Sequence, residues 1–105
     1  MKIELLLVPD CPHGHLAAAH LREALAETGL SPVSITTHVI ADEAEARRVG
    51  FTGSPTILVN GRDPFAVEGA PVSVSCRLYR TPEGVVTGAP GVGQLRDALT
   101  EAAGR

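Results

Sequence analysis

Cysteine is the residue type in this chain best suited to chemistry, and the sequence contains two, Cys11 and Cys76. Two thiols in a chain of 105 residues do not make a disulfide-rich secreted scaffold. In a reducing cytosol, such a pair is instead metal-binding, redox-active or simply buried. The surroundings of each cysteine therefore have to decide among these possibilities.

Cys11 stands where a strand gives way to a helix. The apolar run Lys2–Val8 is too short for a helix and is typical of a central strand that is buried on both faces. Pro12 follows Cys11, and proline is favoured at the first helical position, so we expect Cys11 near a helix N-cap. The helix dipole and free N–H groups there stabilise an anion and favour the thiolate. The alternative is that Cys11 is a small capping residue with no chemistry.

Three helices are expected from the spacing of apolar residues. The Ala- and Leu-rich segment His13–Thr28 has one apolar face and one charged face. Asp42 and Glu45 have the spacing of a capping box, which predicts a short helix through about Val49. The last helix carries a core-facing stripe made of Val92, Leu95, Leu99 and Ala102.

The strands complete a single α/β domain over residues 1–105. Val33–Ile40 is rich in β-branched residues and has a polar second face, so it predicts a strand near a sheet edge. Thr56–Val59 predicts a buried strand, and Cys76–Arg80 with Val85–Thr87 predicts two strands joined by a turn at residues 81–84. The predicted order is β-α-β-α-β-β-β-α.

This order, with a Cys-Pro pair at a helix start, resembles the thioredoxin-like family over nearly the whole chain. The stretch 53–56 (GSPT) is similar to the family's cis-proline loop, which lies against the active-site cysteine. The resemblance implies a thioredoxin-like mixed sheet flanked by helices, a cis bond between Ser54 and Pro55, and Ser54 facing Cys11. The chain departs from the family's C-x-x-C motif at Gly14, where the second cysteine would stand. A conventional dithiol cycle within this motif is therefore excluded, whereas a monothiol mechanism is not.

One interpretation of Cys76 is a buried core residue that takes part in no chemistry, because free cysteine is among the most buried residue types. The thioredoxin-like arrangement implies a different position. The Pro55 end of its strand would lie at the same sheet edge as Cys11, and the strand that begins at Cys76 would run away from that edge. We therefore expect Cys76 to line the same site as Cys11 and to serve as its resolving thiol.

A second, looser resemblance is to organomercurial (alkylmercury) lyase and related small proteins. It rests on the two cysteines, about 65 positions apart, and on the S-C-R-x-Y stretch at residues 75–79. It implies that the thiolates of Cys11 and Cys76 bind mercury or another soft metal. The lyase has an aspartate three residues after its first cysteine, where this chain has Gly14, and Asp10 is adjacent but on the strand side. Capture of a soft metal is therefore expected more than cleavage of a carbon–mercury bond.

Other polar residues near the cysteines complete the expected site. His13 is closest to Cys11 and is a candidate acid/base partner near neutral pH. We expect His13, Asp10, Ser54 and Pro55 to contact the substrate. The other histidines are interpreted as solvated residues, and the side chains at positions 77 and 79 as cover for an edge strand; these residues are His15, His20, His38, Arg77 and Tyr79.

Composition narrows the classes of function. Nine Lys and Arg against twelve Asp and Glu give a net charge of −3, which argues against nucleic-acid binding, since that needs clustered cations. No apolar run approaches the ~20 residues that span a bilayer, and Ile3–Val8 lacks a signal-peptide pattern, so a cytoplasmic protein is expected.

Three interpretations remain open. The first is a thioredoxin-like protein that carries out thiol–disulfide chemistry on a small thiol or a protein. The second is a protein that binds mercury or another soft metal, with no other cofactor expected. The third is a non-catalytic module that grips a peptide through the Pro55 loop.

Overall fold

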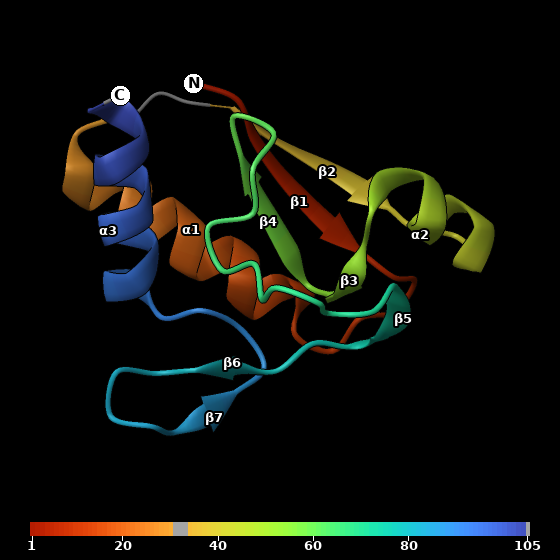
Figure 1. Cartoon of the computed structure of the whole chain (residues 1–105). Coiled ribbons are helices and arrows are strands. Elements are labelled where there is room, and N and C mark those ends of the chain that lie inside the picture. Colours follow the sequence, from red (N-terminus) through yellow and green to blue (C-terminus); the bar gives the residue numbers. More distant parts are fainter. Residues whose placement is uncertain (31–33, 105) are drawn as a thin grey trace.

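The protein has a mixed α/β fold, seen in a computed structural model that describes residues 1–30 and 34–104 (Figure 1). Its main sheet has three strands in the order β2-β1-β4. β1 (Ile3–Leu7) is the central strand, β2 (Ile35–Val39) runs parallel to it, and β4 (Thr56–Val59) runs antiparallel. Two parallel neighbours need a long crossover connection, and helix α1 (Gly14–Thr28) supplies it.

Helices cover both faces of the sheet because the side chains of β1 alternate between two apolar layers. α1 and α3 (Val92–Ala103) lie side by side on one face, where Ile3 and Leu5 pack against them (Figure 1). α2 (Glu43–Val49) lies on the other face, where Leu6 packs in a second cluster with Ala46 and Phe51.

The expected roles of the first two strands are confirmed. β1 is central, and its residues Ile3, Leu5 and Leu6 are buried. β2 lies at the sheet edge, and four of its five residues are exposed. Val33, with which the second strand was predicted to begin, lies outside the described residues.

The chain has two more short strands than the predicted order β-α-β-α-β-β-β-α, and both precede the predicted hairpin. β3 (Thr52–Ser54) pairs in parallel with β5 (Ser73–Cys76), and β6 (Tyr79–Arg80) pairs with β7 (Val86–Thr87) in a hairpin that projects from the body (Figure 1). The predicted hairpin is confirmed, but the strand predicted over Cys76–Arg80 is correct only at Tyr79–Arg80, because Cys76 ends β5 and the hairpin begins three residues later. The physical reason is the N–H of Arg77, which donates to the Ser54 carbonyl at 2.8 Å and so joins this segment to β3.

The helices agree more closely with expectation. The Asp42 carboxylate accepts from the Glu45 N–H at 2.9 Å, but the Glu45 carboxylate accepts from Ala41, one residue before the N-cap, so only half of the capping box forms as predicted. The stripe on α3 faces the core: Leu95 and Leu99 are fully buried, and Val92 and Ala102 pack against them in part. Within the described residues, none of the helices has the length and apolar character required to cross a membrane.

Candidate functional site

The segments that carry the predicted site residues meet at one end of the main sheet. Leu6 on β1 stands opposite Thr56 on β4, so the chain leaving β1 toward Cys11 lies at the same end as the chain entering β4 from Pro55. The peptide bond between Ser54 and Pro55 is cis, as the resemblance implied. The buried Ser54 hydroxyl accepts a hydrogen bond from the Val8 N–H at 3.1 Å, which ties the two segments together.

Cys11 lies two residues before the helix N-cap, which is His13. Its own carbonyl accepts from the Gly14 N–H at 3.2 Å, so residues 11–14 form a turn ahead of the helix. Cys11 is therefore near the N-cap, as expected, but Pro12 is not the first helical residue: it belongs to this turn, and the helix begins at Gly14. Cys11 is a partly exposed free thiol.

Gly14, two residues after Pro12, is closely packed. Gly14 is buried, and a Cβ at this position would lie 3.1 Å from a methyl carbon of Leu7. A side chain there would require the end of the Leu7 side chain to shift by a few tenths of an ångström.

A pocket of about 340 Å³ opens beside Cys11, between α1 and the edge strand β2. Its walls are mostly apolar and include Leu7, Ala18 and Val39, while Asp10 and His15 are the ionisable residues other than Cys11 that line it. Among the residues that the structure describes, no lysine or arginine lines this pocket, and His15 is its one basic side chain. The pocket therefore suits an apolar group better than a group with several negative charges.

Cys76 is exposed and stands directly opposite Ser54 in the parallel pairing of β3 with β5. Ser54 is thus bonded on one side to Val8, three residues before Cys11, and paired on the other side with Cys76. The structure places both cysteine-bearing segments against Ser54, although Cys76 reaches it through a strand that the sequence did not predict.

Arg77 and Tyr79 do not cover an edge strand, and that expectation was wrong. Only 9% of the Arg77 side chain is exposed, and its guanidinium pairs with the Asp63 carboxylate at 2.5 Å. The guanidinium also lies 4.8 Å from the centre of the Tyr79 ring, and Tyr79 is buried. The spacing of Arg77 and Tyr79 places them on one face of a strand, but the sequence carried no signal that this face is buried or that Asp63 lies against it.

Tyr79 connects this cluster to the proline loop. Its hydroxyl donates a hydrogen bond to the Pro55 carbonyl. Burial raises the pKa of Tyr79 well above its ordinary value; the Arg77 guanidinium opposes the rise, and the charges of Asp63 and Cys11 add to it.

Two of the four histidines, His13 and His20, contact distant parts of the chain that the sequence did not indicate. The His13 ring packs on Gly88, where a Cβ would lie 2.4 Å from the ring. His20 is not simply solvated, because its Nδ1 lies 2.8 Å from the Pro90 carbonyl. His15 is exposed as predicted, and so is His38, which pairs with Glu4 at 3.2 Å.

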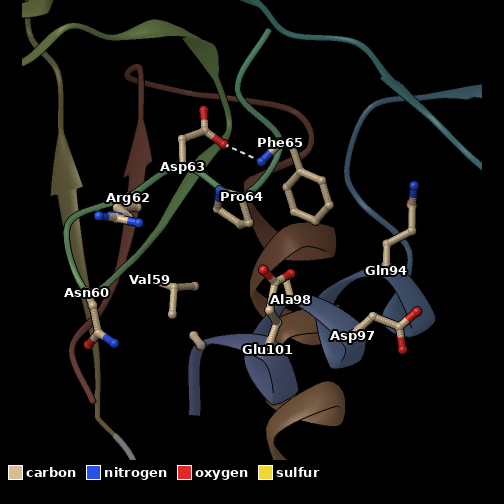
Figure 2. A pocket seen from close by; sticks show the side chains of 11 residues that line it. Val59, Asn60, Arg62, Asp63, Pro64, Phe65, Gln94, Asp97, Ala98 and Glu101 are labelled. Atoms are coloured by element: carbon tan, nitrogen blue, oxygen red, sulfur yellow. Dashed lines mark hydrogen bonds between the residues drawn. The ribbon is translucent and has the colours of Figure 1, made fainter. Parts of the chain in front are cut away.

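A larger pocket of about 700 Å³ lies elsewhere, between the chain after β4 and helix α3, and neither thiol lines it (Figure 2). Several of its polar side chains already serve the fold. The Asn60 amide oxygen accepts from the Lys2 N–H at 2.9 Å, and the Gln94 amide donates to the Arg80 carbonyl at 2.8 Å. We therefore place the candidate site at the thiols rather than in this pocket.

Comparisons with known proteins assign neither a family nor a function to this chain. No protein-family model, curated protein or solved structure matches the chain. Among the described residues, no group of three or more His, Cys, Asp and Glu side chains is arranged to hold a metal ion. The geometry around Ser54 is therefore the feature of the molecule that points to a function.

Proposed function

We propose that this chain is a thioredoxin-like thiol protein in which Cys11 is the nucleophile and Cys76 the resolving thiol. The observation that carries the proposal is the position of Ser54, bonded to Val8 ahead of Cys11 and paired with Cys76. The thioredoxin-like assignment is supported by the parallel β1-α1-β2 unit, the antiparallel β4 after a cis proline, and α2 on the face opposite α1 and α3.

The proposed reaction is thiol–disulfide exchange in two steps. The Cys11 thiolate attacks one sulfur of a substrate disulfide, the substrate S–S bond breaks, and one half leaves as a thiolate. The Cys76 thiolate then attacks the Cys11 sulfur of the mixed disulfide and releases the second half. The protein is left with a Cys11–Cys76 disulfide, which two equivalents of an external thiol reduce back to the dithiol.

The volume and lining of the pocket beside Cys11 favour a small, uncharged substrate that is mostly apolar. Its volume of about 340 Å³ lies in the range of small-molecule sites, and its lining is mostly apolar. A thiol compound with several carboxylates would meet Asp10 there and, among the described lining residues, His15 but no lysine or arginine. We therefore place a small thiol or disulfide ahead of a protein as the substrate.

Mild oxidation followed by non-reducing mass spectrometry tests the proposal. We expect a monomer that is lighter by the mass of two hydrogens and whose cross-linked peptides contain Cys11 and Cys76. Cys11→Ser and Cys76→Ser are the matched controls and should abolish this product. A mixture of unlinked monomer and Cys11-linked dimer would overturn the proposal and favour a non-catalytic binding module.

The same variants test the proposal that the two thiols bind a soft metal. A soft metal ion prefers paired thiolates, so one mercuric ion per chain should protect both thiols from alkylation. Each single variant should lose this one-to-one protection. Independent protection of each thiol, with two ions bound per chain, would contradict a shared site.

A further inference from the structure

The guanidinium of Arg77 makes several polar contacts inside the protein. Its guanidinium pairs with Asp63 at 2.5 Å, donates to the Phe65 carbonyl at 2.6 Å and reaches the Thr56 hydroxyl at 3.3 Å. The side chains of Arg77 and Asp63 are only 9% and 16% exposed. The two members of this largely buried ion pair depend on each other, because removing one would leave the other as an unpaired buried charge.

The backbone of Arg77 also binds the proline loop. The Arg77 N–H donates to the Ser54 carbonyl at 2.8 Å. Gly53 lets the two segments approach, since a Cβ there would lie 2.8 Å from the Cβ of Arg77. Beside it, Tyr79 packs under the guanidinium and donates to the Pro55 carbonyl. Three consecutive residues, from Gly53 to Pro55, are therefore fixed by Arg77 and Tyr79.

Cys76 is joined to this anchored residue by a single peptide bond. Along this stretch Cys76 is exposed, the Arg77 side chain turns inward, Leu78 is exposed and Tyr79 is buried. The thiol is thus presented outward from a backbone whose next residue is fixed by an ion pair and several hydrogen bonds.

We infer that Arg77, held by Asp63, is a positioning residue that fixes the Cys76 thiol opposite Ser54 and holds the cis-proline loop. Its importance for the reaction rests on the proposed function, whereas its effect on the backbone does not. Lysine cannot replace it, because an ammonium lacks the planar fork that contacts a carboxylate and a backbone carbonyl at once.

Backbone hydrogen exchange tests the positioning directly in Arg77→Lys and Asp63→Asn, with Arg77→Met as a stronger variant. We expect amide protection to fall at least tenfold in segments 52–54 and 73–77, and to stay unchanged in β1 and α1. Arg80→Met is the matched control, because Arg80 is an exposed arginine of the neighbouring hairpin. Unchanged protection in the two segments, or a uniform loss over the whole chain, would overturn the inference. If Arg77→Met does not fold, the two milder variants decide.

A second measurement connects the positioning to the thiol pair. The equilibrium between the Cys11–Cys76 disulfide and a reference dithiol should shift at least tenfold toward the reduced protein in Arg77→Lys, far below the unfolding temperature. A merely structural role would lower the unfolding temperature without moving this equilibrium. If the native chain forms no such disulfide, the proposed function fails, and hydrogen exchange alone still decides the role of Arg77.

Discussion

The hydroxyl of Ser54 accepts a hydrogen bond from the N–H of Val8 at 3.1 Å, although 46 positions separate the two residues. Val8 follows the central strand, whose own ladder with β4 ends at the pair Leu6–Thr56. The bond therefore extends the contact between these strands by a side chain, beyond the last pair of the backbone ladder. It also fixes the start of the segment that carries Cys11.

Ser54→Ala should destabilise the protein by about 1–3 kcal/mol, because it leaves the partly buried Val8 N–H without its partner. Urea unfolding measures this loss. Ser75→Ala is the control, since Ser75 is exposed on β5, and its effect should stay within about 0.5 kcal/mol. Equal effects of the two substitutions would show that the hydroxyl of Ser54 contributes nothing specific.

Gly53→Ala should cost more than a glycine substitution in an open turn. Gly53 has a φ of +133°, and an added Cβ would lie 2.8 Å from the Arg77 Cβ and 3.2 Å from its Cα. Gly84→Ala is the matched control, because Gly84 also has a positive φ of +85° but has no atom within 4 Å of an added Cβ. Positive φ alone costs roughly 1–2 kcal/mol, and overpacking adds about 1–3 kcal/mol. Thermal or urea unfolding of both variants measures the difference, and equal losses would contradict a close approach at Gly53.

The helices and central strands of this chain could be predicted from sequence because their signals are local. The buried stripe on α3 depends on the spacing of Leu95 and Leu99, and the edge position of β2 depends on its polar face. Both patterns lie within one element, so no knowledge of the rest of the fold is needed.

The surroundings of Cys76 could not be predicted in the same way. Asp63 and Arg77 are 14 positions apart and meet only because residues 63–76 return to pair with β3. Each of the two residues has the sequence environment of an ordinary surface charge. Resemblance to a family implied the cis bond at Pro55, but it could not reveal the strand β5 that brings Cys76 opposite Ser54.

Tyr79 should make the protein less stable in alkaline solution. Its pKa in the folded state is raised by burial, whereas in the unfolded chain it ionises near pH ~10. The contribution to stability is therefore fully present below the unfolded value and is lost as pH rises above it, by about 1 kcal/mol per pH unit. Urea unfolding between pH 8 and about 11.5 should show this loss in the native chain and not in Tyr79→Phe.

Absorbance gives an independent check, because Tyr79 is the only tyrosine and the chain has no tryptophan. The phenolate band should appear together with unfolding, at a pH well above that of a free tyrosine. A band that appears near pH ~10 while the fold persists would contradict the buried position of the hydroxyl.

The apolar character of the pocket beside Cys11 predicts which reagents Cys11 prefers. In a Cys76→Ser background, uncharged dithiodipyridine should react faster, relative to a free model thiol, than dianionic dithiobis(nitrobenzoate). The reason is that the described lining of the pocket has apolar walls, Asp10 and His15, but no lysine or arginine. Stopped-flow absorbance measures both rates.

Val39→Lys should reverse part of this preference. Val39 lines the pocket at the sheet edge and is 56% exposed, so a lysine there places a cation beside Cys11 at little cost in stability. We expect the ratio of the anionic to the neutral rate to rise about three- to tenfold at low salt and to fall again as salt screens the charge. Val49→Lys is the control, because Val49 is 53% exposed on α2 and lies outside the pocket. An equal change in both variants would mean that net charge, rather than this pocket, controls access to the Cys11 thiol.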